Sequence, residues 1–390
     1  MLEAKAAAQR VQESIASAMV ALSHRIHAFP ELGFQEERAS EWVGEALASG
    51  GFTVSQGVAN LPTAIEATIG SGDLVIALCA EYDALPEIGH ACGHNVIASA
   101  AVTAALSLAP LVDELGLTLK VLGTPAEEGG GGKILMLDAG IFDHIHAAMM
   151  VHPSPREDVE MRALAVSHML IEYQGKTAHA SAAPEKGINA GDALTVAQVS
   201  IGLLRQQLPS NCQVHGIVAH GGEAPNVIPG RTEAHYYLRS TTLAGLEDVR
   251  PRINRCFEAG ALATGATLRI TELSPPYSEF DTDSRIAAYY VNNATALGRQ
   301  FDPISGTAKP MGGSTDMANV SLKLPSIHPM LRIDCGDSVN HQPEFAAHCA
   351  EASADKALLE GGLAMAWTII DLATDEQERD RLMRRVPAAD

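Results

Sequence analysis

Two short segments of this chain combine residue types that bind metals. The segment GHACGHN, at 89–95, places His90, Cys92 and His94 at alternate positions. The segment TPAEEGG, at 124–130, places Glu127 and Glu128 side by side before a run of glycines. Imidazole, thiolate and carboxylate are the ligands that divalent transition metals prefer. A second carboxylate beside a ligating one can act as the base for a metal-activated water. The two segments therefore predict a metallohydrolase.

Each segment also has an interpretation without a metal. Cys92 could be a buried thiol beside structural histidines. The two glutamates could lie in an exposed acidic loop that leads into a helix, where acidic side chains are favourable. The run GGGGK at 129–133 does not match the phosphate-loop pattern, because Ile134 follows the lysine.

Buried strands are expected to position these residues. Apolar runs at 64–69, 74–80, 117–122 and 147–151 are interspersed with helical segments at 2–28, 37–49, 96–106 and 133–137. This pattern indicates an α/β domain with a mixed, largely parallel sheet flanked by helices. Polar residues follow three of the strands, namely Glu81 and Asp83, the Glu127–Glu128 pair, and His152. Open α/β sheets place their sites at the carboxyl ends of strands, so we expect one shared site.

The pattern changes from about residue 164, where strands enclose two helical segments at 190–207 and 244–263. This part resembles a small ferredoxin-like α+β layer. The α/β pattern returns after Pro275 and ends in a helix at about 347–371. We therefore expect a discontinuous catalytic domain at 1–159 and 274–390, with a second domain inserted at 160–273.

Composition excludes several classes of protein. A length of 390 residues favours about two domains. The formal net charge of −20 argues against a nucleic-acid partner, because phosphate binding needs clustered Lys and Arg. The N-terminus lacks the apolar core of a signal peptide, and no apolar run is expected to reach the ~20 residues that span a bilayer. Six scattered cysteines do not form a disulfide framework. We expect a cytoplasmic protein without a membrane partner.

Eight motifs, in order, resemble those of the M20 metallopeptidase family, in its amidohydrolase branch with a Cys ligand. The resemblance covers nearly the whole chain. The motifs are PELGFQE (30–36), AEYDALP (80–86), GHACGHN (89–95), PAEEGGGG (125–132), GKTAHAS (175–181), NVIPG (226–230), GGSTDMANVS (312–321) and NHQPEF (340–345).

The resemblance implies a metal centre and the residues that form it. The implied ligands of two divalent ions, zinc or manganese with cobalt or nickel as alternatives, are Cys92, His94, Glu128, His152 and His341. Glu127 matches the general base, and Asp83 matches a residue that orients the site. Glu81 stands where other family members have a ligating histidine, and this departure leaves Cys92 to bridge the ions.

The inserted domain is implied to act as a lid and to form a homodimer. His179 matches a histidine that stabilises the oxyanion, often in the partner subunit's site, and Asn226 matches a residue that contacts the reacting group. Arg239 could bind a substrate carboxylate or could form a surface ion pair. His328 could support a ligand from outside the first coordination sphere.

These implications predict an amidohydrolase that splits an N-acyl or aryl-acyl amino acid into a carboxylic acid and an amino acid. A dipeptidase or carboxypeptidase with the same site is an alternative, so the expected partner is a small N-acyl amino acid, aryl amide or dipeptide. A catalytically silent metal-binding protein is a further alternative. The presence of Glu127 together with every implied ligand argues against it.

Overall fold

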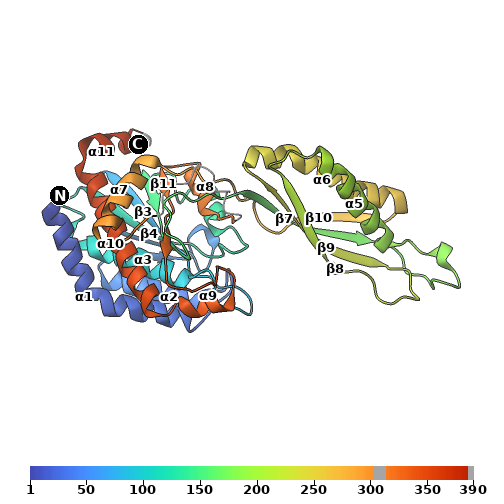
Figure 1. The fold of residues 1–390 in the computed structure, drawn as a ribbon, viewed down its shortest axis with the longest axis horizontal. Coiled ribbons are helices and arrows are strands. Elements are labelled where there is room, and N and C mark those ends of the chain that lie inside the picture. The colour runs from blue at the N-terminus through green and yellow to red at the C-terminus, as the bar shows by residue number, and fades with distance from the viewer. Residues whose placement is uncertain (302–312, 385–390) are drawn as a thin grey trace. The chain divides into compact units, whose positions relative to one another are not determined.

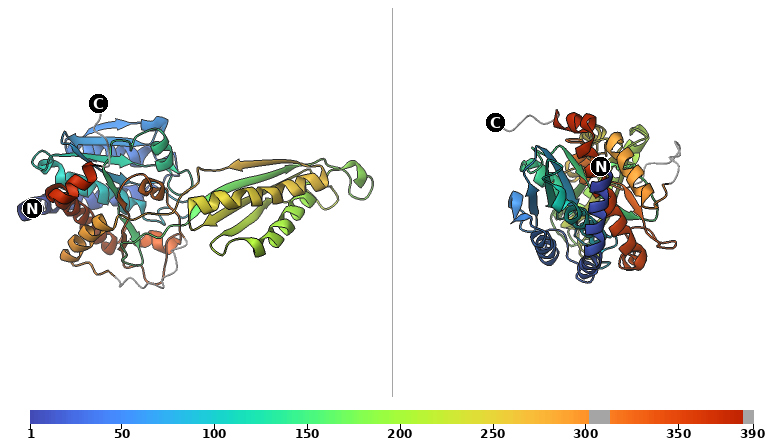
Figure 2. Two further views of the ribbon diagram at one scale, coloured as in Figure 1. Left: turned by 90° about the horizontal axis from the view of Figure 1, so that it is seen from above. Right: turned by 90° about the vertical axis from the view of Figure 1, so that its left-hand side faces the viewer.

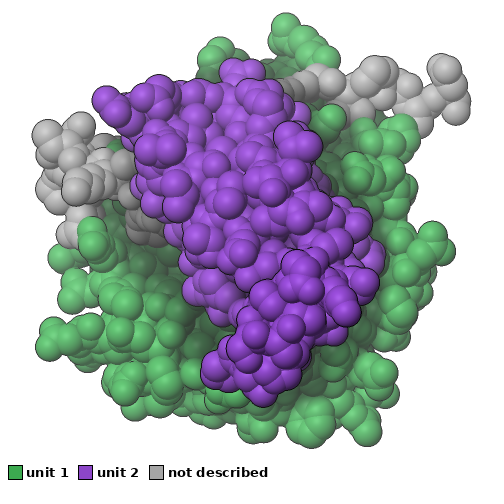
Figure 3. Space-filling model, turned by 90° about the vertical axis from the view of Figure 1, so that its right-hand side faces the viewer, with its two compact units in different colours: residues 1–162, 280–311, 315–390 green, residues 163–279, 312–314 purple. Residues whose placement is uncertain are grey.

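The computed structural model describes residues 1–301 and 313–384. The chain divides into two compact units, which Figure 3 colours separately. Unit 1 comprises Met1–Arg162, Phe280–Met311 and Thr315–Asp390, and unit 2 comprises Ala163–Glu279 and Gly312–Ser314. Each unit has its own hydrophobic core, as separate domains do.

Unit 1 is built on a six-stranded sheet with the order β1-β2-β4-β3-β5-β11. Its strands are β1 (Thr53–Gln56), β2 (Ile65–Gly70), β3 (Leu74–Ala80), β4 (Leu117–Gly123), β5 (Ala147–Met149) and β11 (Ser326–Ile327). The pairs β3–β4, β3–β5 and β5–β11 are parallel, whereas β1–β2 and β2–β4 are antiparallel. Two further strands, β6 (His152–Ser154) and β12 (Met330–Arg332), pair in parallel. The predicted mixed, largely parallel sheet is confirmed.

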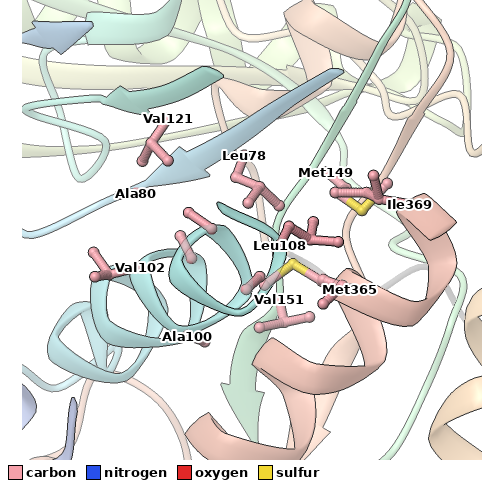
Figure 4. Close-up of a cluster of buried hydrophobic side chains, with 14 of the residues drawn as sticks. Leu78, Ala80, Ala100, Val102, Leu108, Val121, Met149, Val151, Met365 and Ile369 are labelled. Atoms are coloured by element: carbon pink, nitrogen blue, oxygen red, sulfur yellow. The ribbon is translucent and has the colours of Figure 1, made fainter. Parts of the chain in front are cut away.

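Helices enclose this sheet (Figures 1 and 2). They are α1 (Leu2–His27), α2 (Glu37–Ser49), α3 (His94–Leu108), α4 (Gly132–Asp138), α7 (Ser284–Ala296), α8 (Met317–Ser321), α9 (Pro343–His348), α10 (Ala352–Thr374) and α11 (Glu376–Met383). All residues of α3 are buried, because it packs against β3 and β4 as well as α1 and α10. A largely apolar helix that is buried on every side occupies such an interior position. Figure 4 shows Leu78 of β3, Leu108 of α3 and Ile369 of α10 in this core.

Unit 2 has the element order β7 (Ala165–Gln174), α5 (Ala190–Leu204), β8 (Gln213–His220), β9 (Arg231–Ser240), α6 (Leu243–Thr264) and β10 (Thr267–Glu272). Its antiparallel sheet has the order β10-β7-β9-β8. Helices α5 and α6 pack together on one face of this sheet (Figures 1 and 2). The predicted ferredoxin-like α+β layer is thereby confirmed.

Two expectations about helices need correction. The helix expected at about 347–371 is two helices, because α9 ends at His348 and α10 begins at Ala352. Asn95 Nδ2 donates to the Cys349 carbonyl at 2.9 Å, in the break between them. In addition, His94–Leu111 and Ala352–Thr374 are long and apolar enough to cross a membrane, by length and composition only. Both are mostly buried, and core helices of globular proteins pass the same test.

The contact between α10 and α3 depends on a glycine. A Cβ added at Gly362 would lie 2.8 Å from the Ala100 carbonyl oxygen and 2.8 Å from Thr103 Cβ. We expect Gly362→Ala to lower the free energy of unfolding of unit 1 by about 1–3 kcal/mol, because the two helices must move apart. Urea denaturation measures this change. Gly44→Ala in α2 is the matched control, since its Cβ would meet nothing closer than Val54 Cγ1 at 3.5 Å. Equal midpoints for Gly362→Ala and the unaltered protein would contradict this packing argument.

Candidate metal centre

The strand ends of unit 1 converge on one group of polar residues. Glu81 and Asp83 follow β3, the Glu127–Glu128 pair follows β4, and His152 begins β6 shortly after β5. Because β3, β4 and β5 run parallel, their carboxyl ends meet at one edge of the sheet.

Three sets of ligand atoms gather at this edge. One comes from Glu81, His94 and Glu127, and the other two share Cys92. One atom each from Cys92, His94 and His152 lie within 4.8 Å of one another, as do atoms from Cys92, Glu128 and His341. The structure therefore brings together all five ligand residues implied by the sequence, with the thiol common to the last two sets.

Asp83 connects the ligands that come from different segments. Its Oδ1 lies 2.9 Å from His94 Nδ1, and its Oδ2 accepts a hydrogen bond from the Glu128 backbone N–H at 3.0 Å. Although burial opposes the charge, His94 lowers the pKa of Asp83. With its Nδ1 held by a carboxylate, the His94 ring directs Nε2 at the site, as metal-bound histidines do.

A hydrogen bond to the backbone carbonyl of the next residue orients the His152 ring. Its Nδ1 lies 2.8 Å from the Pro153 carbonyl oxygen and donates to it, which leaves Nε2 as the ligand atom. Burial, with His328 adding to it, lowers the pKa of His152 to about 3. The ring is therefore neutral, which is the state that binds a metal.

Glu127 and Glu128 both reach His94 Nε2 because the turn before them is unusual. Ala126 has a φ of 56°, in the left-handed region that L-residues rarely adopt. Its N–H donates to Glu36 Oε1 at 2.8 Å, and Thr63 Oγ1 donates to Glu36 Oε2 at 2.8 Å. Sequence reasoning assigned no role to Glu36, although it lies within the PELGFQE motif.

Gly93 permits the close approach of its two neighbouring ligands. Its φ is 73°, and a Cβ there would lie 2.3 Å from Pro153 Cγ. His341 approaches from another segment, with its N–H donating to the Ala91 carbonyl at 2.9 Å. His341 Nε2 lies 3.5 Å from Glu128 Oε2, and the His341 side chain is 60% exposed, so this part of the centre is open.

The charges at the centre fit bound cations. Burial raises the pKa of Glu127 well above its ordinary value, and Glu81 and Glu128 add to this shift. Burial and the Glu128 carboxylate likewise raise the pKa of the Cys92 thiol. A thiolate beside several buried carboxylates is stable only with positive charge among them, and a divalent metal supplies it.

A buried ion triad lies beside the ligands and was not predicted. Lys133 Nζ lies 2.5 Å from Glu81 Oε1 and 2.6 Å from Asp316 Oδ1, and all three side chains are fully buried. Lys133 belongs to the GGGGK run and Asp316 to the GGSTDMANVS motif, and both segments were visible in the sequence. Neither segment indicates that these two side chains meet in the fold.

The other predicted site residues, His179, Asn226 and Arg239, lie in unit 2. His179 and Val227 form an isolated β-bridge, and the Ala180 N–H donates to the Asn226 carbonyl at 2.9 Å. His179 Nδ1 accepts from the backbone N–H groups of Ser181 and Ala182, each at 3.3 Å, so a neutral ring carries its proton on Nε2. Arg239, on β9, donates to Ser314 Oγ at 3.0 Å.

Comparisons with known proteins now decide the family. The family model described as peptidase family M20/M25/M40 matches residues 77–363. The chain belongs to this family. It is 36% identical to the Xaa-Arg dipeptidase of Mus musculus over 380 residues, which cover 94% of this chain and 88% of that protein. It is also 31% identical to one of the subunits of the p-aminobenzoyl-glutamate hydrolase of Escherichia coli K12, over 76% of this chain and 64% of that protein.

Solved structures share the M20 fold. The Bacillus subtilis YXEP protein, described as a dinuclear metal binding peptidase from the M20 family, has a TM-score of 0.68 at 22% identity. The match covers 92% of this chain and 99% of that one. An aminobenzoyl-glutamate utilization protein from Klebsiella pneumoniae has a TM-score of 0.70 at 19% identity, covering 90% and 97%. This M20 chain is a metallo-amidohydrolase, a hydrolase of C–N bonds.

The Glu36 carboxyl makes the stability of this M20 enzyme depend on pH. Burial, with Asp83 adding to it, raises the pKa of Glu36 from 4.5 to about 7. The native state therefore binds this proton more tightly than the unfolded state does. Its contribution to stability is full below pH 4.5 and declines as the pH rises to 7, by about 3 kcal/mol in total.

Glu36→Gln removes this titration while keeping the shape of the side chain. After chelator treatment, we expect the stability of Glu36→Gln relative to the unaltered protein to improve by about 3 kcal/mol between pH 4.5 and pH 8. Urea denaturation at both pH values measures it. Glu45→Gln, at an exposed position of α2, controls for the loss of a carboxylate. A constant difference across this range would show that Glu36 titrates normally.

Proposed function

We propose that this M20 enzyme hydrolyses the amide bond of an N-acyl or aryl-acyl amino acid, releasing a carboxylic acid and an amino acid. The observation that carries the proposal is the position of Glu127. One of its carboxylate oxygens lies 3.8 Å from His94 Nε2, so a carboxylate not needed as a ligand stands beside the ligand atoms.

Two divalent ions, zinc or manganese with cobalt or nickel as alternatives, are proposed to be held by Cys92, His94 and His152 and by Cys92, Glu128 and His341. Such ions activate water and polarise a carbonyl group. Glu127 takes a proton from the attacking water and passes it to the leaving amine nitrogen as the C–N bond breaks. The raised pKa of Glu127 suits both tasks, since the carboxyl group must gain and then lose a proton.

Residues of unit 2 are proposed to complete substrate binding. His179, through its Nε2–H, and Asn226 stabilise the negative charge that develops on the carbonyl oxygen. Arg239 binds the carboxylate of the amino-acid product. Unit 2 acts as the inserted domain that excludes water when substrate binds.

A dipeptidase is the second candidate, and one observation favours it. The match to the mouse relative named Xaa-Arg dipeptidase covers 94% of this chain, whereas the match to the p-aminobenzoyl-glutamate hydrolase covers 76%. The purified protein with Mn²⁺ or Zn²⁺, assayed for amine release, separates the two. The test substrates are N-acyl amino acids, p-aminobenzoyl-glutamate and dipeptides with or without a C-terminal arginine. Turnover of dipeptides alone would replace the first proposal by the second.

We also propose a cytoplasmic location. All six cysteines are unpaired, a state that a reducing compartment maintains. Fractionation of cells followed by immunodetection tests this location.

Glu127→Gln tests the proposed base. We expect this variant to fold and to retain its metal content, because the amide keeps the shape of the side chain. Turnover falls by at least a hundredfold, since general-base catalysis contributes about 10²–10⁴-fold. Amine release and elemental analysis measure the two quantities. Glu114→Gln, at an exposed position, is the control for a neutralised glutamate. Near-normal turnover in Glu127→Gln would refute the mechanism.

We further propose that the enzyme is a homodimer through unit 2. Strand β8 is an edge strand, paired only with β9 among the described residues. It carries Ile217, 68% exposed, and Val218, 46% exposed. Exposed apolar edge strands readily pair with a second chain.

Ile217→Lys is expected to convert this dimer to a monomer, because a charge then stands on the pairing edge. Light scattering measures the mass. Leu262→Lys is the matched control, since Leu262 is an 88% exposed apolar residue on α6 and should leave the dimer intact. A fully active monomer of the unaltered protein would refute a role for His179 in the partner's site.

A further inference from the structure

His328 is a buried imidazole whose two ring nitrogens have no hydrogen-bond partner among the described residues, 1–301 and 313–384. The residue is 1% exposed. An imidazole carries at least one N–H donor in either protonation state, so at least one buried donor is left without an acceptor. Native proteins rarely leave such a group unpaired without a functional reason.

The fold places His328 at the same sheet edge as the metal centre. It directly follows β11, which runs parallel to β5, and the end of β5 leads to His152. On one side of His328, the Met150 N–H donates to the Ile327 carbonyl at 3.3 Å. On the other side, the His152 N–H donates to the Pro329 carbonyl at 2.9 Å. The backbone of His328 is therefore held at this edge by the strands themselves.

Two neighbouring rings fix the orientation of the His328 side chain. It stacks on the ring of His152, with centroids 5.4 Å apart and planes 28° from parallel. Phe280 meets it edge to face, with centroids 5.9 Å apart and planes at 70°. Neither contact pairs a ring nitrogen. His328 therefore does not orient His152 through a hydrogen bond, as residues that support a metal-bound histidine do.

The metal centre has a use for a donor of this kind. The side chains of its three ligand sets are carboxylates, imidazoles and a thiol, which present acceptor atoms to a metal. The nearby buried donor Lys133 is committed to Glu81 and Asp316. Negative charge that develops on a substrate carbonyl oxygen is stabilised by donors aimed at it. At this edge, His328 supplies a ring N–H with no other partner among the described residues.

We propose that His328 is a further catalytic residue, which donates a hydrogen bond from a ring N–H to the carbonyl oxygen of the scissile amide. This inference rests on the proposed function, because the carbonyl group belongs to the amide that is hydrolysed there. It gives unit 1 an oxyanion donor of its own, in addition to the proposed His179 and Asn226 of unit 2. The stack on His152 keeps the ring beside the metal ligands, and the substrate supplies the missing acceptor.

His328→Phe tests the contact, because it removes the N–H and keeps a flat ring that can stack on His152. The kinetics use the metal-loaded protein and the best substrate among the N-acyl amino acids, p-aminobenzoyl-glutamate and dipeptides. We expect kcat to fall about 10²–10³-fold, the loss typical of a deleted oxyanion donor. KM should change little, since the contact strengthens in the transition state. Elemental analysis should find the metal content unchanged.

Rescue by a retained N–H separates this contact from simple packing. The amide nitrogen of His328→Gln can stand near the position of Nε2, and that of His328→Asn near Nδ1. We expect one of the two to recover kcat by about tenfold over His328→Phe, as a restored donor should. The matched control is His146→Phe, which should leave kcat unchanged. His146 is a buried imidazole, 6% exposed, and it precedes β5 at the opposite edge of the sheet.

A transition-state analogue gives a readout that needs no turnover. In a phosphinic pseudo-dipeptide, a tetrahedral phosphorus that carries two oxygens replaces the scissile amide. Calorimetry on the metal-loaded protein measures its affinity. We expect His328→Phe to bind it about 10–100-fold more weakly, the loss typical of one hydrogen bond to a charged group. The binding stoichiometry reports the folded fraction, so a poorly folded variant is not mistaken for a lost contact.

The possible failures can be told apart. If the unaltered protein hydrolyses none of the amides, the proposed function is wrong and this inference falls with it. If the unaltered protein is active and His328→Phe retains its kcat and its affinity for the analogue, the ring has only a packing role. The same holds if kcat falls only together with the metal content. Both of these results overturn this inference and leave the proposed function standing.

Discussion

The Asp83 carboxylate is the contact on which the geometry of the metal centre depends. It lies three residues beyond the end of β3, a strand with parallel neighbours on both sides, so its position is set by the interior of the sheet of unit 1. From there it orients the His94 ring and holds the backbone of Glu128. One fully buried side chain thus joins the first turn of α3 to the turn after β4. Because those two segments are 34 residues apart, no local rule of chain geometry would keep them aligned.

This arrangement has a cost that the rest of the centre must offset. Asp83, Glu81 and Glu127 are all nearly or fully buried, and each would oppose the ionisation of the others. Lys133 neutralises part of this charge, and the ligand sets are suited to bind cations that neutralise the remainder. The centre is therefore an arrangement in which folding and metal binding favour each other, as is common where ligands are buried together.

Much of this arrangement could be predicted from the sequence. Continuous apolar runs indicate buried strands, and apolar residues at helical spacing indicate helices. The run at 74–80 is uniformly apolar and coincides with β3, and the helices at 2–28 and 37–49 differ from α1 and α2 by a single residue at most. The meeting of three strand ends at one edge of the sheet followed from the expected parallel arrangement of those strands. The positions of His152 and His341 beside Cys92, by contrast, came from the family resemblance, because their spacing along the chain indicates nothing about their distance.

The residues that sequence reasoning missed share a physical property. Lys133 and Asp316 are 183 positions apart and meet only through the tertiary fold. A buried lysine is also unexpected, since an isolated ammonium group is excluded from a protein interior. Glu36 was missed for the same reason, because its contact with Ala126 spans 90 positions. A single sequence contains no signal for such pairs, whereas an apolar periodicity or a ligand triplet is visible locally.

The adjacent glutamates show how backbone conformation separates two identical side chains. In a regular strand, Glu127 and Glu128 would point to opposite faces, and only one could reach the centre. The left-handed Ala126, held by Glu36, begins an irregular turn in which both carboxylates approach His94 Nε2, at 3.8 Å and 3.9 Å. The difference between them then arises from their contacts. Glu128 is anchored through its N–H to Asp83, and although burial raises the pKa of its carboxyl group, the nearby His94 and His341 oppose this shift. Glu127 lies in a more buried position beside Glu81, where a proton is favoured. A general base must take up a proton and release it again, which requires the buried surroundings of Glu127. The same turn therefore gives Glu128 the surroundings of a ligand and Glu127 those of a base.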